Sequence, residues 1–362
     1  MNLKAKKLLT PGPLTTSPSV RAAMNIDLGT RDDEYASIVA GIGTKLLKLA
    51  NANPNEYKCI FLQGSGTYGV EAVLTSSISD KDKVLILANG AYGIRMSQIC
   101  EHAKKNYTLK SYSMIEQLDL KEIEPLIASN EYTHVAFIHS ETTAGILNNL
   151  EGIMKLVHKY HKISIVDAMS SFGGVNIDLN NLQIDYLVTS ANKCLHGVPG
   201  VALIIAKEEQ LKRCKGNAVS LSLDLYEQYE TMLNNYSFRF TSPTHVMLAL
   251  NQGIDELIAS GGINERNKHY KNLQAYIAKF MKELGFKTLV DENIQCPVIT
   301  TYLNPEGFDF KKFYDHMKDE GYLLYSGKLA DYDAFRIGNI GDLNMDDIRK
   351  LESLVRNYRE EN

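Results

Sequence analysis

The chain has 362 residues, of which 44% are hydrophobic and 23% charged, so its length and composition suit two ordinary globular domains. Its 25 glycines and 9 prolines exclude a collagen-like or disordered chain, and a formal net charge of −4 gives no sign of nucleic-acid binding. No run of about 18 apolar residues is present, so we expect no transmembrane helix and no membrane partner.

The five cysteines are scattered along the chain, without a Cys-x-x-Cys pair. An odd number without close spacing indicates neither a disulfide framework nor a zinc site. The N-terminal residues are basic but precede no long apolar run, so they do not predict a signal peptide. We therefore expect a cytoplasmic protein with no bound metal.

Short apolar runs alternate with amphipathic segments over the first two thirds of the chain. The runs predict six strands, at residues 59–63, 84–89, 134–139, 163–167, 186–190 and 201–206. Most lack strict polar alternation, which is typical of strands buried on both faces of a mainly parallel sheet. Helical patterns such as residues 119–129 and 150–161 lie between them, and this βαβ order predicts an open α/β sheet covered by helices.

The pattern changes after about residue 259. A Gly-Gly pair at residues 261–262 predicts a helix stop, and a long helix is expected at about residues 264–284. Strands at 297–303, 322–325 and 334–337 and helices at 310–320 and 345–358 complete a smaller α+β unit. We therefore predict a large α/β domain over residues 16–258 and a small C-terminal domain over residues 259–362.

Residues 64–69 read Gly-Ser-Gly-Thr-Tyr-Gly, directly after a predicted strand and before a helix. This matches the GxGxxG dinucleotide motif, but the motif lies about 60 residues into the chain. The next strand ends in Asn89, where a ribose-binding carboxylate would be expected. Backbone amides with the Ser65 and Thr67 hydroxyls suit a phosphate at a helix N-terminus, and a purely structural turn is the alternative.

Two ionisable residues follow neighbouring predicted strands. Asp167 ends one strand, and Lys193 follows the next, ahead of the turn Gly-Val-Pro-Gly at residues 197–200. Ligands bind at the carboxyl ends of parallel strands, and a desolvated lysine amine is a nucleophile for carbonyls. A phosphate cradle, a carboxylate and a lysine together indicate pyridoxal 5′-phosphate. Taken singly, Asp167 has a second interpretation as a loop cap.

Motifs along nearly the whole chain resemble those of the fold-type I, class V aminotransferases. They lie at residues 9–17, 31–33, 64–67, 89–93, 139–145, 166–169, 190–194, 239–245 and 335–339. The runs Ala-Asn-Lys-Cys and Arg-Phe-Thr-Ser-Pro-Thr-His are most similar to the branch that acts on 2-aminoethylphosphonate and pyruvate. The resemblance implies a fold-type I, pyridoxal-phosphate-dependent transferase with a mainly parallel seven-stranded sheet, a small C-terminal domain and an N-terminal arm, residues 1–15, that reaches the active site.

Carried over by position, the resemblance implies that Lys193 forms a Schiff base with the cofactor and moves the proton. It implies that Asp167 pairs with the cofactor ring nitrogen. The other implied cofactor residues are Ser65, Gly66 and Thr67 at the phosphate, Tyr92 and Met169 on the two ring faces, Thr142 at the phenolic oxygen, and Thr241 at the phosphate of a neighbouring subunit. A homodimer with shared active sites is therefore expected.

The substrate residues are also given by the resemblance. Arg336 is expected to bind the anion of each substrate, 2-aminoethylphosphonate and pyruvate, with Arg31, Thr10, Gly12 and Lys328 as further contacts. Considered alone, each of these residues has a structural interpretation, such as a surface charge for Arg336 or a helix-start ion pair for Arg31. Three positions depart from the family pattern, namely Ser242, His196 and Ser326.

The expected reaction is transfer of an amino group from 2-aminoethylphosphonate to pyruvate, giving phosphonoacetaldehyde and alanine. An alanine–glyoxylate or serine–glyoxylate transaminase is the first alternative, and a cysteine desulfurase is disfavoured because Tyr92 stands where that family has a histidine. An NAD-dependent oxidoreductase and a noncatalytic cofactor-binding protein are the alternatives from other classes.

Overall fold

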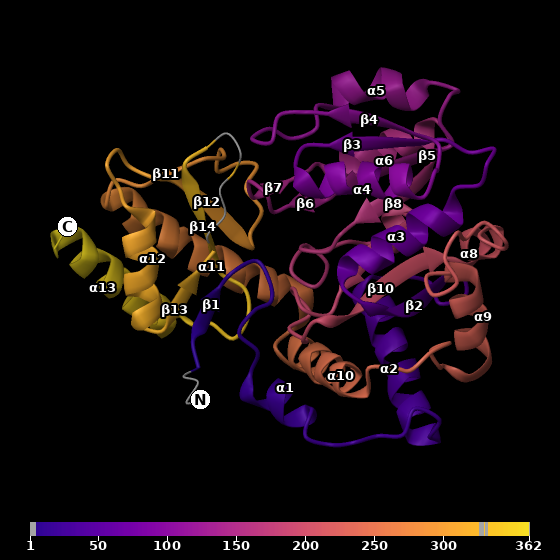
Figure 1. The fold of residues 1–362 in the computed structure, drawn as a ribbon, viewed down its shortest axis with the longest axis horizontal. Coiled ribbons are helices and arrows are strands. Elements are labelled where there is room, and N and C mark those ends of the chain that lie inside the picture. Colours follow the sequence, from indigo (N-terminus) through magenta and orange to yellow (C-terminus); the bar gives the residue numbers. More distant parts are fainter. Residues whose placement is uncertain (1–4, 326–328, 330–331, 362) are drawn as a thin grey trace.

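The computed structural model describes residues 5–325, 329 and 332–361, and its larger part is built on a seven-stranded sheet (Figure 1). The strand order is β2 (Tyr57–Gly64), β10 (Gly200–Lys207), β9 (Tyr186–Ser190), β8 (Ile163–Asp167), β5 (His134–Ile138), β3 (Val84–Ala88) and β4 (Tyr107–Ser111). Only β10 runs against the others, pairing antiparallel with both β2 and β9. The six remaining strands therefore end at the same edge of the sheet.

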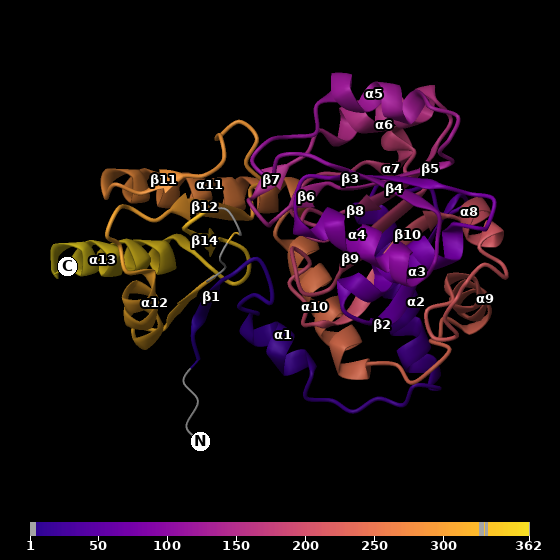
Figure 2. The same ribbon diagram turned by 45° about the horizontal axis from the view of Figure 1, so that its top comes forward.

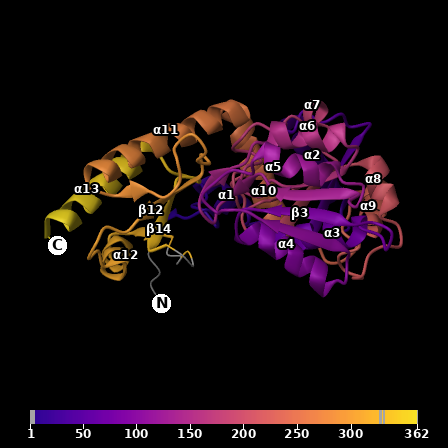
Figure 3. The same cartoon turned by 90° about the horizontal axis from the view of Figure 1, so that it is seen from above.

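Helices cover both faces of this sheet. The order along the chain is α1 (Pro18–Ala23), α2 (Asp33–Leu49), α3 (Gly66–Ser77), α4 (Ala91–His102), α5 (Leu120–Ala128), α6 (Leu150–Lys159), α7 (Leu179–Leu182), α8 (Glu208–Arg213), α9 (Leu225–Asn235) and α10 (Thr244–Ala259). Figure 3 shows α3 and α4 on one side of the sheet and α6 and α7 on the other. Strands β3, β5 and β9 are buried along their whole length, as the continuous apolar runs predict.

Carboxylate and amide side chains mark where several helices begin. Asp32 accepts a hydrogen bond from the Glu34 amide at the start of α2, and Asn149 accepts one from the Gly152 amide at the start of α6. Such N-caps satisfy amides that have no partner within the helix. The start of α3 differs, since Ser65 stands at the cap position but its hydroxyl makes no capping bond.

The C-terminal part lies beside the large sheet, with the short strands β6 (Ser140–Glu141) and β7 (Ile146–Leu147) at the junction (Figure 2). It contains a sheet of β11 (Lys287–Thr288), β12 (Ile299–Leu303) and β14 (Ala334–Gly338), with helices α11 (Gly262–Glu283), α12 (Phe310–Asp319) and α13 (Met345–Glu361). Its apolar core is separate from the core around the large sheet. Helix α11 joins the two, because Ile263 packs in the first core and Leu273 in the second.

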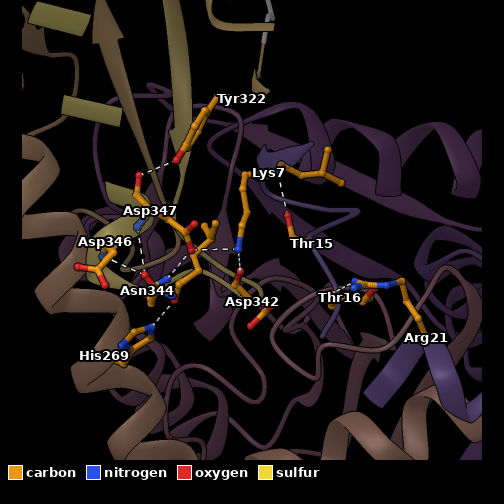
Figure 4. A network of polar contacts seen from close by, with 12 residues as sticks. Lys7, Thr15, Thr16, Arg21, His269, Tyr322, Asp342, Asn344, Asp346 and Asp347 are labelled. Carbon is orange, nitrogen blue, oxygen red and sulfur yellow. Dashed lines mark hydrogen bonds and ion pairs between the residues drawn. The ribbon is translucent and has the colours of Figure 1, made fainter. Parts of the chain in front are cut away.

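The N-terminal segment is attached to this C-terminal part rather than to the large sheet. Strand β1 (Lys7–Leu9) pairs in parallel with β13 (Tyr322–Leu324), and Leu9 is fully buried in the small core. Lys7 Nζ contacts Asp347 Oδ2 at 3.0 Å and the Asp342 carbonyl oxygen at 2.9 Å (Figure 4). The segment therefore crosses from the small core towards the edge of the large sheet.

The predicted strands and helices are confirmed, with ends that differ by up to three residues. Strands β1, β4, β6, β7 and β11 were not predicted. Strand β4 is only partly buried at the edge of the sheet, so it lacks the apolar run of the central strands. All five cysteines are free. Among the helices of the described residues, none combines the length and apolarity needed to cross a membrane.

Candidate active site

A cavity of about 210 Å³ lies where the large-sheet strands end. Its lining includes seven residues expected from the sequence, namely Ser65, Gly66, Thr67, Tyr92, Asp167, Met169 and Lys193. They come from the ends of β2, β8 and β9 and the start of α4. Sheet topology thus brings together side chains up to 128 positions apart in the sequence, from Ser65 to Lys193.

The first wall of the cavity is the start of α3. Gly64 has φ +136°, which favours glycine, and a Cβ at Gly66 would displace the end of the Met169 side chain. The uncapped Ser65 hydroxyl and the first amides of α3 face an anion-binding position. The dinucleotide interpretation lacks its context here, because β2 is an edge strand with an antiparallel neighbour.

Asp167 lies at the end of β8 and is buried. The Met169 amide donates to Oδ1 at 2.8 Å, and no hydrogen bond reaches Oδ2 from the residues that the structure describes. Burial raises the pKa of this carboxyl from 3.8 to about 7, and the hydrogen bond from Met169 lowers it less than burial raises it. A cationic partner within the cavity would therefore stabilise the carboxylate.

Lys193 faces the same cavity from the loop after β9, and the N-terminal segment lies directly over it. Nζ donates to the Pro11 carbonyl oxygen at 2.8 Å, and a Cβ at Gly12 would collide with the lysine side chain. Burial lowers the pKa of the Lys193 amine from 10.5, with Asp167 opposing this effect. A lowered pKa increases the neutral, nucleophilic fraction of the amine.

Arg336 on β14 extends from the small part to the junction with the large sheet. Its Nη1 donates to the Thr142 and Thr143 carbonyl oxygens at 2.9 and 3.3 Å, and its guanidinium carbon lies 4.4 Å from the centre of the Tyr325 ring. Nε is buried without a hydrogen-bond partner in the described part of the chain. An unpaired charged donor is costly, so this edge of the guanidinium is suited to an anionic ligand.

The structure does not bring all the expected residues to this cavity. Thr241 and Arg31 line a second cavity of about 1030 Å³, beside residues 235–242. Thr10 reaches the junction, because a Cβ at Gly338 would collide with its carbonyl group. Ser242 is hydrogen-bonded to the Tyr35 hydroxyl in the interior. Lys328 and Ser326 lie outside the described residues.

One polar residue at the junction was missed in the sequence. Glu141 is fully buried and accepts bonds from the amides of Tyr92 (3.2 Å) and Thr143 (3.0 Å) and from the Thr143 hydroxyl (2.6 Å). It thus joins the start of α4 to the loop whose carbonyls bind Arg336. The signal was a carboxylate inside the 139–145 motif, of which only Thr142 was assigned a role.

His196 follows Lys193 closely and joins its loop to the small part. The residue has φ +59°, and its Nε2 accepts from the Tyr270 hydroxyl at 2.6 Å and from the Gly341 amide at 3.3 Å. Burial, with Arg266 nearby, lowers the pKa of the ring well below its usual value, so the imidazole is neutral. A neutral ring can accept both bonds at Nε2 while Nδ1 carries the proton.

Replacing His196 with alanine is expected to lower the free energy of unfolding by about 1–3 kcal/mol for each buried donor left without a partner. Urea denaturation measures this change. Tyr270→Phe is the matched control, since it removes one donor together with the bond. The double variant should lose less than the sum of the two single losses. Additive losses would show that His196 and Tyr270 are not coupled.

The described residues fit pyridoxal phosphate by their chemistry. A buried carboxylate without a cation matches the protonated ring nitrogen, a lysine with a lowered pKa matches the aldehyde, and the start of α3 matches the phosphate. Burial raises the pKa of the Tyr92 phenol, and a hydrogen bond with the neighbouring Thr142 side chain opposes this rise. Tyr92 and Met169 both line the space between these groups.

The raised pKa of Asp167 predicts a pH effect on the cofactor-free protein. A carboxyl whose folded pKa lies above its unfolded value stabilises the fold at low pH, and this contribution is lost as pH rises through the folded pKa. As the pH rises from 4 to about 7, ionisation of Asp167 should therefore lower the free energy of unfolding. Asp167→Asn should remove this part of the pH dependence. Urea denaturation of both cofactor-free proteins at pH 5 and 8 tests this. An equal change in the free energy of unfolding between the two pH values in both proteins would contradict the effect of burial.

Comparison with known proteins adds family relationships to this geometry. The family model "Aminotransferase class-V" matches residues 19–329. A 2-aminoethylphosphonate–pyruvate transaminase of Bacteroides fragilis is 47% identical over 358 residues, which cover 98% of this chain and 99% of that protein. A bifunctional phosphonoacetaldehyde hydrolase/aminoethylphosphonate transaminase of Clostridioides difficile is also 47% identical, and the match spans 97% of this chain but only 56% of that relative.

Solved structures agree with this fold. The ureidoglycine–glyoxylate aminotransferase of Bacillus subtilis superposes with a TM-score of 0.90 at 25% identity, covering 99% of this chain and 94% of that one.

Proposed function

Because the chain belongs to the class-V aminotransferase family, we propose that it transfers the amino group of 2-aminoethylphosphonate to pyruvate, giving phosphonoacetaldehyde and alanine. Members of this fold-type I family use pyridoxal 5′-phosphate, which is the cofactor expected from the sequence. The observation that carries the proposed substrate pair is 47% identity over nearly the full length to a transaminase of that name.

When bound, the cofactor supplies an aldehyde for amine exchange and a ring that withdraws electrons from the substrate carbon. In this proposal Lys193 Nζ would hold the cofactor at its aldehyde carbon, with the aldehyde oxygen leaving as water, and would later move the proton from the donor carbon. The Asp167 carboxylate holds the proton on the ring nitrogen. Burial supports both roles, because it raises the pKa of Asp167 in the absence of a bound cation and lowers the pKa of the Lys193 amine.

Substrate binding in this proposal depends on Arg336. Both substrates carry an anion, and a guanidinium binds phosphonate and carboxylate through two parallel hydrogen bonds. The Nη1 contacts with Thr142 and Thr143 fix the side chain, so Nε and Nη2 form the free edge. Pro11 and Gly12 cover Lys193 and exclude water from the amine.

The direct test is alanine formation from purified protein, cofactor, 2-aminoethylphosphonate and pyruvate. The proposal expects alanine and an aldehyde in equal amounts, with little product when alanine or serine is the donor and glyoxylate the acceptor. The reverse preference would assign the chain to the alternative glyoxylate branch. No amine exchange with any donor would leave a noncatalytic cofactor-binding protein.

A homodimer with shared sites is part of this proposal. Thr241, expected at a cofactor phosphate, lies in the second cavity and not beside Ser65 of its own chain. Exposed apolar side chains gather around that cavity, including Leu221 (74% exposed) and Phe240 (53% exposed). Exposed apolar patches of this kind mark interaction surfaces, and a second chain would cover this one. Arg31 shares the cavity and would enter the neighbouring site with Thr241.

A mixed dimer of one Lys193→Ala chain and one Thr241→Val chain tests this arrangement. If Thr241 acts across the interface, one site has both defects and the other has none. The intact site should then bind cofactor with the affinity of the unmodified protein, measured by dialysis of dimers purified through two different tags. Affinity equal to that of the Thr241→Val homodimer would place Thr241 in its own subunit's site.

The domain limits at residues 15 and 258 and a cytoplasmic location also remain part of the proposal. Two separate apolar cores support the division, and four buried cysteines among five free ones support a reducing compartment.

A further inference from the structure

Arg95 faces the cavity from α4 and belongs to none of the residue sets expected from the sequence. It lines the cavity together with Ser65, Thr67 and Lys193. Its guanidinium carbon lies 5.0 Å from the centre of the Tyr92 ring, one helical turn earlier, and its Nη1 donates to Thr67 Oγ1 at 3.3 Å. The side chain therefore touches both the ring-stacking residue and the phosphate-binding residue proposed above.

The charge of Arg95 is not neutralised within the described chain. No carboxylate lies within 4.0 Å of it there, whereas many other surface cations of the chain have such a partner. Burial raises the pKa of both Asp167 and Tyr92, and the positive charge of Arg95 opposes part of each rise, so its field reaches both groups. Together, the exposed arginine, the helix start and the two hydroxyls suit the binding of an anion.

We propose that Arg95 is a further cofactor-binding residue, which neutralises the phosphate of pyridoxal phosphate together with the start of α3. A phosphate monoester carries about 1.5–2 negative charges near pH 7, more than a helix terminus with a partial charge of about 0.5 can balance. The Thr67 hydroxyl lies between the two, and guanidinium groups bind phosphate oxygens in a fixed fork. Stacking on Tyr92 keeps the fork in place.

The alternative is that Arg95 only supports the Tyr92 ring. The two roles differ in which part of the cofactor they affect. Pyridoxamine 5′-phosphate and pyridoxamine differ by the phosphate alone, and neither has an aldehyde for Lys193. Their dissociation constants therefore report noncovalent contacts without the covalent link and without turnover.

Equilibrium dialysis of both compounds against Arg95→Gln and Arg95→Lys tests the inference. With Arg95→Gln, the dissociation constant of pyridoxamine 5′-phosphate should rise about 10- to 150-fold, the loss expected for one charge-assisted bond. The constant for pyridoxamine should stay within about twofold. Arg95→Lys should recover part of the loss, because it keeps the charge without the fork.

Lys81→Gln is the matched control, since it removes an exposed positive charge from the turn before β3, at the opposite edge of the sheet. It should change neither constant. An equal rise for both compounds with Arg95→Gln would overturn the inference and leave Arg95 as a support of Tyr92. No rise for either compound would also overturn it. Circular dichroism of each variant shows whether the fold is kept, and Arg95→Lys answers the same question if Arg95→Gln does not fold.

Discussion

Lys193→Ala is expected to lower transamination by at least about 10²–10⁴-fold, the usual contribution of one positioned proton carrier. The change removes the covalent link and the proton carrier together, and nothing else in the cavity lining combines these properties among the described residues. The variant should still bind pyridoxal phosphate through Ser65, Thr67 and Asp167. Single-turnover kinetics with 2-aminoethylphosphonate measure the rate, and borohydride treatment shows whether the cofactor is linked to the chain.

Lys162→Ala is the matched control for this prediction. Like Lys193, Lys162 has a pKa lowered by burial, and it donates to backbone carbonyl oxygens, those of Ser129 and Tyr132, but it does not line the cavity. Its loss should affect stability and leave the rate intact. Added methylamine should restore part of the rate of Lys193→Ala by supplying an amine. If Lys193→Ala keeps a reducible link and near-normal turnover, Lys193 does not bind the cofactor.

Arg336→Ala is expected to reduce kcat/KM for both half-reactions by about 10- to 150-fold, since a charge-assisted bond contributes roughly 1.5–3 kcal/mol. The buried Nε without a partner indicates that the free chain is incomplete at this position. The spectrum of the bound cofactor should not change, because Arg336 contacts the Thr142 and Thr143 carbonyls and not Lys193. Arg336→Lys should recover only part of the loss, as an ammonium lacks the fork.

The control for Arg336 is Arg359→Lys. Arg359 also stacks on aromatic rings of the small part, 5.6 Å from the centre of Phe286, but it lies on α13, whereas the Thr142 and Thr143 carbonyls bind Arg336. It should leave both half-reactions unchanged. A defect limited to pyruvate would mean that another cation binds the phosphonate, and an unchanged rate with both substrates would remove Arg336 from the site.

The central strands were predictable because burial on both faces requires a local run of apolar residues, and β3 and β9 are such runs. Strand β1 could not be predicted in this way, because its three residues become a strand only through pairing with β13, more than 300 positions later. Local patterns contain no information on a partner so distant.

The candidate site was predictable for residues whose type indicates one chemical role, such as a lysine amine or a carboxylate at a strand end. Lys193 and Asp167 follow neighbouring strands, so sheet topology alone brings them together. Arg95 was missed because an exposed arginine on a helix has the same local pattern as any solvated charge. Thr241 lines a different cavity from Ser65, and its role at the phosphate of a neighbouring subunit, expected only from family resemblance, stays a prediction.

The path of the N-terminal segment has a practical consequence for handling the protein. Lys7 and Leu9 are fixed to the small core, and only two positions after Leu9 the Pro11 carbonyl oxygen contacts Lys193 Nζ. Bulk fused just ahead of Lys7 would strain this short span and open the cover of the amine. Helix α13 ends at the far end of the small part (Figure 1). Purification handles and surface immobilisation therefore belong at the C-terminus, where they leave the cover over Lys193 in place.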